Sequence, residues 1–309
     1  MKKRGVFPDP LLSVVTMKPL FIIAVTGITA FAGINSCPVT TGSVNRTFTG
    51  GPTYSNVVVP GAGTGNPLSN SLSALDAAAG GCTTIDLTFS NFALVSSGTN
   101  EGTLPSLAGT YLSVTPTGTT QTGPDTLLFS ALQGNGTGAD GASNDGVDNF
   151  KLNNNEAFTT TMSYGVADSA GTGILAVVLT VNDITISAGG SGFVTIDTCS
   201  KGATVITGSI TSAAACTAAA PGAVFTSTTI TLAQLASQSA TVSLASTPTY
   251  VNVTQVISLT CNACGINETG FLTFSDQFLE TPEPSTFVVL VPLLCLMVYR
   301  RFRAFMPSA

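Results

Sequence analysis

The sequence predicts an all-β fold, an antiparallel β-sandwich, on three observations. Apolar and polar residues alternate with the period of a half-buried strand, as in Thr84–Ser90, where Ile85, Leu87 and Phe89 share one face. Similar stretches recur at short intervals, and Gly, Asn, Asp and Pro separate them. Only 8% of the residues are charged, whereas Ser, Thr and Val are abundant, which suits a β-protein with hydroxyl groups on its solvated faces.

An N-terminal signal peptide is expected over residues 1–32. Its apolar segment, Leu20–Phe31, ends in small residues that a signal peptidase accepts, so cleavage is expected before Gly33. The positive charges ahead of that segment come from Lys2, Lys3, Arg4 and Lys18. Two alternatives stay open, a start of translation at Met17 and a lipoprotein site at Cys37.

Residues 33–281 are expected to form one β-rich extracellular domain. One helix is predicted, because Leu68, Leu72, Leu75 and Ala79 recur at helical spacing before two glycines. A change of phase at Asn182-Asp183 predicts a bulge or tight turn. The expected strands are 55–59, 84–90, 109–115, 126–132, 147–152, 157–165, 175–181, 192–197, 203–210, 224–232, 239–245, 251–260 and 269–275.

Residues 201–222 are small and low in complexity, and they predict a loop that could separate two halves of the sandwich. A parallel β-helix is the alternative fold, since secreted chains rich in Thr, Ser and Gly also adopt it. The sequence has no repeat of fixed length, which disfavours a solenoid.

Six cysteines precede the C-terminal tail, and an even number in an exported chain predicts three disulfides. Six cysteines allow fifteen pairings. The simplest pairs sequence neighbours: Cys37–Cys82, Cys199–Cys216 and Cys261–Cys264. A zinc or redox role for the last pair is disfavoured, because the chain has no histidine and no βαβ pattern surrounds the pair.

The charge balance excludes nucleic acid as a partner. Between residues 33 and 283 there are fifteen acidic and three basic residues, which gives a net charge of −12. Such a surface repels phosphate backbones and anionic lipid headgroups. It could attract divalent cations or simply keep a secreted protein soluble.

The residue types do not predict an enzyme. Without histidine, the chain cannot form a Ser-His-Asp or Cys-His arrangement. A pair of carboxylates could still support glycoside hydrolysis, but no spacing singles one out. The best candidate site is a Gly-rich loop at 140–149, where oxygen ligands for Ca²⁺ are Asp140, Asn144, Asp145 and Asp148. The alternative is a solvated turn. No cofactor is expected other than this Ca²⁺.

The C-terminal segment 282–309 begins with Pro282-Glu283-Pro284, continues through an apolar segment at 286–299 and ends in a basic cluster, Arg300, Arg301 and Arg303. Thirteen apolar residues make roughly 20 Å of helix at about 1.5 Å per residue. A hydrocarbon core is about 30 Å thick, so this transmembrane segment spans only marginally. The arginines should stay cytoplasmic, which leaves the body outside.

This tail resembles the PEP-CTERM sorting signal of Gram-negative bacteria, although Pro292 and Cys295 depart from the usual run rich in Leu and Gly. The resemblance implies processing by an exosortase-type membrane protease and contact with extracellular polysaccharide, whereas cleavage by signal peptidase is expected from the N-terminal pattern. It implies a protein anchored in the cell envelope membrane, or one at the cell surface after processing.

The sequence therefore predicts a non-enzymatic structural protein of the cell surface or extracellular matrix. The alternative function is a calcium-dependent carbohydrate-binding module or adhesin that uses the loop at 140–149. A hydrolase is the third and weakest reading.

Overall fold

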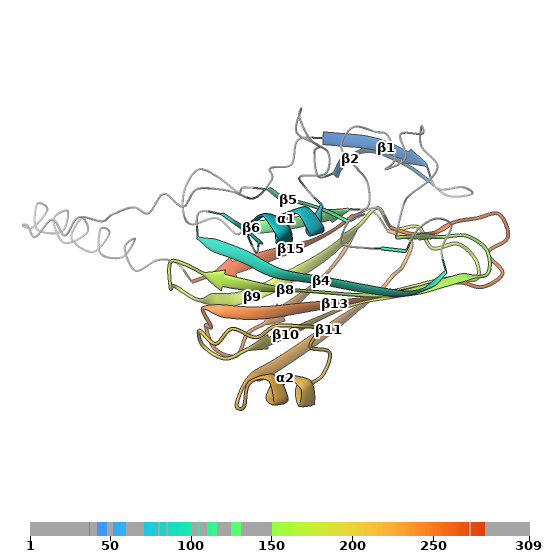
Figure 1. Cartoon of the computed structure of the whole chain (residues 1–309). Helices are drawn as coiled ribbons and strands as arrows, with labels where there is room; N and C mark the ends of the chain where they lie inside the picture. The colour runs from blue at the N-terminus through green and yellow to red at the C-terminus, as the bar shows by residue number, and fades with distance from the viewer. Residues whose placement is uncertain are drawn as a thin grey trace, which may run out of the picture. The chain divides into compact units, whose positions relative to one another are not determined.

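The chain folds into antiparallel β-sheets, as the alternation predicts (Figure 1). The computed structural model describes residues 37, 42–47, 52–59, 71–79, 81–84, 86–99, 104–105, 110–115, 125–130, 150–235, 237–271 and 273–281. Every strand pairing within these ranges is antiparallel, which confirms the all-β prediction and excludes the parallel β-helix for them. Neither helix in these ranges is long and apolar enough to cross a membrane.

Two sheets account for most of the strands. The six-stranded sheet has the order β11-β10-β13-β8-β4-β3, and the five-stranded sheet has the order β12-β9-β15-β6-β5. Two small sheets, β1-β2 and β14-β7, complete the described part. The elements are β1 (Gly42–Thr47), β2 (Thr53–Val59), α1 (Leu72–Ala79), β3 (Gly81–Thr83), β4 (Leu87–Thr99), β5 (Tyr111–Thr115), β6 (Asp125–Ser130), β7 (Lys151–Leu152), β8 (Glu156–Asp168), β9 (Ile174–Asn182), β10 (Gly190–Ser200), α2 (Ala213–Ala219), β11 (Val224–Thr231), β12 (Ser237–Ser243), β13 (Tyr250–Cys261), β14 (Thr269–Gly270) and β15 (Thr273–Glu280).

The alternation of the sequence decides which face of each strand is buried. In β13, Ile257 and Leu259 are buried in the core, whereas Ser258 and Thr260 between them are partly exposed. At the predicted change of phase after β9 the chain bends, and Asp183 has a φ of 57°. This left-handed residue returns Ile184 to the buried side after Val181.

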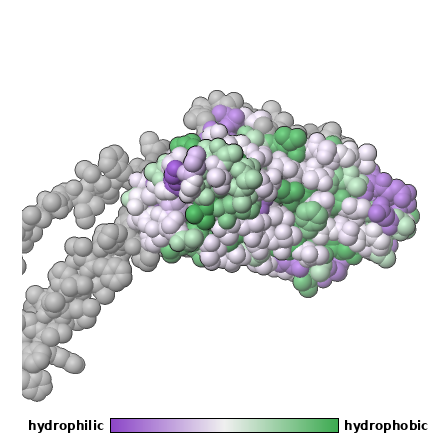
Figure 2. Space-filling model, turned by 90° about the horizontal axis from the view of Figure 1, so that it is seen from below, coloured by the Kyte–Doolittle hydropathy of each residue, from purple (hydrophilic) through white to green (hydrophobic). Residues whose placement is uncertain are grey.

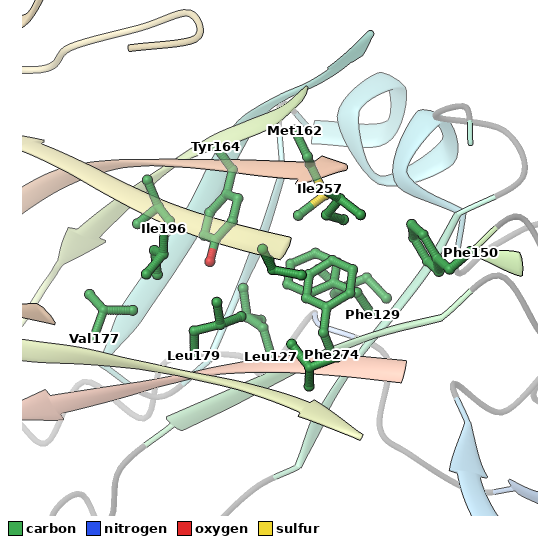
Figure 3. Close-up of a cluster of buried hydrophobic side chains, with 14 of the residues drawn as sticks. Leu127, Phe129, Phe150, Met162, Tyr164, Val177, Leu179, Ile196, Ile257 and Phe274 are labelled. Carbon is green, nitrogen blue, oxygen red and sulfur yellow. The ribbon is translucent and has the colours of Figure 1, made fainter. Parts of the chain in front are cut away.

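Aromatic and aliphatic side chains together fill the space between the two main sheets (Figure 3). Phe129 of β6 lies 4.8 Å from Phe274 of β15, measured between ring centroids, and 5.7 Å from Tyr164 of β8. Phe89 of β4 lies 5.6 Å from Phe278 of β15. The Phe129–Phe274 contact lies within one sheet, because β6 and β15 are neighbours in it. Since β4 and β8 belong to the other sheet, the Phe129–Tyr164 and Phe89–Phe278 contacts join the inner faces of both sheets in one core.

Residues 201–222 contain no strand, so the predicted strand at 203–210 is wrong. Gly202 and Gly208 have φ of 54° and 84°, which breaks an extended course. The segment crosses the outer face of the six-stranded sheet, where Ile206 and Ile210 are buried in a second, smaller cluster. It also contains α2, which begins where the Ser212 side chain accepts the Ala215 N–H at 3.2 Å. Both main sheets contain strands from before and after this segment.

Three disulfides join the six cysteines in the pairing of sequence neighbours. Cys37–Cys82 attaches the segment before β1 to β3, and Cys37 also donates its N–H to Thr83 O at 3.2 Å. Cys199–Cys216 attaches α2 to β10, and Cys261–Cys264 closes the turn after β13. All six cysteines are buried. The separations along the chain are 45, 17 and 3 residues.

We expect the longest closed loop to contribute most to stability. In the chain-entropy account, the 45-residue separation of Cys37 and Cys82 is worth about 4 kcal/mol of unfolding free energy, and the 3-residue separation of Cys261 and Cys264 is worth roughly 1.5 kcal/mol. Urea unfolding of the two double-serine variants measures both values. An equal loss in the two variants, or a larger loss at Cys261 and Cys264, would contradict this ranking.

Candidate functional site

The two predicted sites, one in a loop and one in the C-terminal tail, lie outside the described residues. These are the calcium loop, with Asp140, Asn144, Asp145 and Asp148, and the sorting signal that begins at Pro282. The described residues do show what flanks each of them. Phe150 and Lys151 follow the loop directly, and Thr281 precedes the sorting signal.

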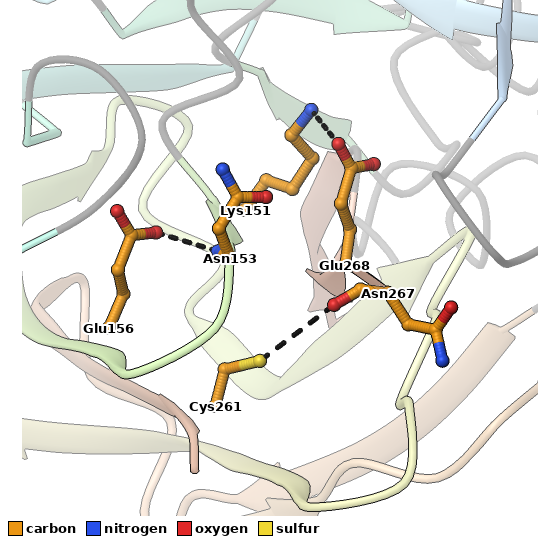
Figure 4. A network of polar contacts seen from close by, with 6 residues as sticks. All are labelled: Lys151, Asn153, Glu156, Cys261, Asn267 and Glu268. Carbon is orange, nitrogen blue, oxygen red and sulfur yellow. Dashed lines mark hydrogen bonds and ion pairs between the residues drawn. The ribbon is translucent and has the colours of Figure 1, made fainter. Parts of the chain in front are cut away.

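A buried ion pair holds the chain just after the predicted calcium loop (Figure 4). Lys151 Nζ of β7 lies 2.9 Å from Glu268 Oε1, and both side chains are buried. Nearby, Glu156 Oε2 accepts the Asn153 N–H at 2.6 Å, which closes the turn between β7 and β8. The pair lies beside the pairing of β7 with β14, and removing one partner would leave an uncompensated buried charge there.

Four carboxyl groups gather at one end of the main sheets, and sequence reasoning missed them. Asp86 precedes β4, Asp125 begins β6, Asp168 ends β8 and Glu280 ends β15. Asp168 accepts the Gly171 N–H at 2.9 Å, and the Thr84 hydroxyl donates to Asp125. The four groups come from distant parts of the sequence, so no local motif could have revealed them.

Burial and mutual repulsion keep two of these groups protonated above their usual range. Burial is the main cause that raises the pKa of Glu280 to about 9, and the charges of Asp86, Asp168 and Asp125 add to it. Burial also raises the pKa of Asp125 to about 6, although the hydrogen bond from Thr84 opposes the shift. A protonated carboxyl can donate to a neighbouring carboxylate, which lets the cluster persist without a cation. Within the described ranges, no three His, Cys, Asp or Glu residues are arranged to hold a metal ion.

The same end of the body fixes the start of the C-terminal tail. Thr281 donates its N–H to Gly173 O at 3.1 Å, and its hydroxyl donates to Thr172 O. The turn that accepts these bonds is itself held by Asp168, through the N–H groups of Gly171 and Gly173. The chain is therefore anchored one residue before Pro282.

A carboxyl group also lies in the core between the sheets. Asp276 of β15 is fully buried, and its Oδ2 accepts hydrogen bonds from the Tyr164 hydroxyl and from Gln255 Nε2. Asp276 Oδ1 and Gln255 Oε1 have no hydrogen-bond partner in the described part of the chain. Burial raises the pKa of Asp276 to about 7. The alternation of apolar and polar residues in β15 could have predicted that Asp276 is buried, because it stands between Phe274 and Phe278 on the apolar face.

The outer face of the six-stranded sheet has a covered half and an open half. Over the covered half, residues 201–222 bond to side chains of the sheet. Ile210 donates its N–H to Thr254 Oγ1 at 2.9 Å, and Asn252 Nδ2 donates to Ile206 O and Gly208 O at 3.2 Å. The covering segment is therefore an irregular chain whose backbone groups bond to the polar side chains of this face.

The open half, hereafter the open face, carries hydroxyl and apolar side chains, and none of its described residues is charged. Strand register sets its side chains in rows across five strands. Its residues are Val95, Ser97, Thr99, Ala157, Thr159, Thr161, Ser191, Phe193, Thr195, Thr229, Thr231, Val256, Ser258 and Thr260.

Two of its side chains are large, apolar and exposed, since Phe193 is 41% exposed and Val95 is 69% exposed. Hydroxyl groups of neighbouring strands bond to each other, with Thr195 Oγ1 2.8 Å from Thr229 Oγ1. The next row on this side includes Asp197, which is only 3% exposed.

Figure 2, seen from below the view of Figure 1, shows mostly pale and green surface, with its largest purple area at one end. Strongly hydrophilic side chains are thus sparse between the ends.

Comparisons with protein-family models, with curated proteins and with solved structures find no match to this chain. The functional assignment therefore rests on the residues themselves.

Stability should fall as the pH rises, because the shifted carboxyls bind protons more tightly when folded. Asp276 contributes unfolding free energy that is fully present below its unfolded pKa of 3.8 and is lost as the pH rises through its folded pKa of about 7. The contributions of Asp125 and Glu280 are lost in the same way as the pH rises through about 6 and about 9. Asp276 is fully buried, so its share is roughly 4 kcal/mol at about 1.4 kcal/mol per pKa unit.

Urea unfolding at pH values from about 4 to about 9 measures this trend. The Asp276→Asn variant should flatten the curve near pH 7, whereas Asp76→Asn, at an exposed position of α1, should keep it. A wild-type protein that gains stability from about pH 5 to about pH 8 would refute the assignment.

Proposed function

We propose that the chain is an exported, non-enzymatic structural protein of the bacterial cell surface or extracellular matrix. The observation that carries this proposal is the set of three disulfides, which includes every cysteine between the two terminal segments. Disulfides persist in oxidising compartments outside the cytosol. The signal-peptide pattern at residues 1–32 is the route by which such a chain would reach one.

The body is proposed to be an antiparallel β-sandwich. Support comes from two antiparallel sheets whose inner aromatic residues share one core. Sandwiches of this type display their outer faces and end loops to the surroundings. This suits a protein that acts through its surface.

The tail at 282–309 is proposed to be a PEP-CTERM sorting signal with a transmembrane segment at 286–299. Its composition supports this reading, and so does the anchoring of Thr281, which holds the body up to the residue before Pro282. An exosortase-type protease would need an accessible segment next to a stable domain. Processing there would release the body from the membrane.

A carbohydrate-binding module or adhesin is the second candidate. The open face favours it, since hydroxyl groups around an exposed phenyl ring are the groups that contact sugars. Calcium dependence of that binding would rest on the loop at 140–149 alone.

Intact-mass measurement of the protein from its native host tests the first proposal. We expect a mature chain that begins near Gly33 and lacks Arg300–Ala309, because both signals would have been removed. Peptide mapping without reduction should recover the three disulfides. Material that retains both terminal segments throughout, or that has free thiols at Cys199 and Cys216, would overturn the proposal.

A further inference from the structure

We propose that the open face binds an uncharged polysaccharide chain, an inference that rests on the proposed extracellular location. Charge gives the first argument. The part of the chain between residues 33 and 283 has a net charge of −12, yet the open face carries no charged side chain. An anionic polymer would be repelled by the body as a whole, and a second copy of the chain would be repelled likewise. A neutral polymer is not repelled by the negative charge of the body.

The chemistry of the face matches a chain of sugar rings. Each ring presents hydroxyl groups at its edge and C–H groups on its face. The open face offers the same pair of groups, with Thr195, Thr229 and Ser258 around the exposed ring of Phe193. Adjacent strands are about 4.8 Å apart and alternate residues about 7 Å apart, so hydroxyl groups repeat along both directions of the sheet. An aromatic side chain supplies the apolar contact for one ring.

The covered half shows how a chain lies on this sheet. Residues 206–210 bond to Asn252, Thr254 and Ser163 through backbone groups and the hydroxyl of Ser209. Partners on the segment thus satisfy the polar side chains of the face. On the open half the hydroxyl groups bond only to one another in the described residues, as Thr159 does to Ser258 at 3.3 Å. A hydroxyl group can donate once and accept twice, so each pair retains capacity for a ligand.

Affinity electrophoresis in native gels tests the proposal with soluble neutral polymers, namely hydroxyethyl cellulose, dextran and starch, and with anionic alginate. At least one neutral polymer should retard the protein, and alginate should not. Phe193→Ala should weaken the retarding interaction about tenfold, as truncation of a central aromatic contact does. Thr195→Glu should weaken it as well, by adding a charge.

The matched control is Leu175→Ala, because Leu175 is 39% exposed but lies on the five-stranded sheet. This variant should behave as wild type. A chelator should not change the retardation of the wild-type protein. Calcium-dependent retardation that survives Phe193→Ala would assign binding to the loop at 140–149 and overturn the proposal. So would the absence of retardation by every neutral polymer, or self-association in size-exclusion chromatography that Phe193→Ala abolishes. None of these failures would alter the mass of the mature protein, which tests export separately.

Discussion

The aromatic layer between the two main sheets is the interaction on which the rest of the structure depends. Tyr164 of the six-stranded sheet contacts Phe129 and Phe278 of the five-stranded sheet, and Phe129 also contacts Phe274 beside it, so these rings draw together strands far apart in the sequence. Each of these rings buries much apolar area, and buried Leu, Ile and Val side chains pack around them. The inner face of each strand is thereby committed to the core, and the outer face is left for hydroxyl side chains and for contacts with other molecules.

Buried carboxyl groups lower the unfolding free energy of this fold at neutral pH. Asp276 interrupts the aromatic layer, and its bonds to Tyr164 and Gln255 link β15 to β8 and β13 across the two sheets. At one end of the sheets, Glu280 lies among the carboxyl groups of Asp86, Asp125 and Asp168. Protonation relieves the unfavourable burial of charge at both sites, so the unfolding free energy should be higher at mildly acidic pH than at alkaline pH. A gain in specificity of sheet pairing is the compensation that a buried polar link can supply.

Local patterns predicted most of the strands, the helix at 72–79 and the change of direction at Asp183, because alternation and turn residues act over short distances. The strand expected at 203–210 failed for a tertiary reason. Val205 and Ile206 have the sequence pattern of a strand. In the structure, Ile206 is instead buried against the outer face of the six-stranded sheet, and the Cys199–Cys216 disulfide tethers the segment there. Ser212 before a run of alanines was the signal for α2. The acidic end and the open face arise from the order of strands in a sheet, which a single sequence does not encode locally.

The most direct test of the central role of the aromatic layer is the unfolding free energy of Phe274→Ala, compared with that of Phe193→Ala. Phe274 is fully buried between the sheets and Phe193 is 41% exposed on the outer face. Loss of a buried phenyl ring should cost about 3–5 kcal/mol and loss of the exposed one less than about 1 kcal/mol, each in a single cooperative transition. Equal losses in the two variants, or separate unfolding of the two sheets, would contradict this account.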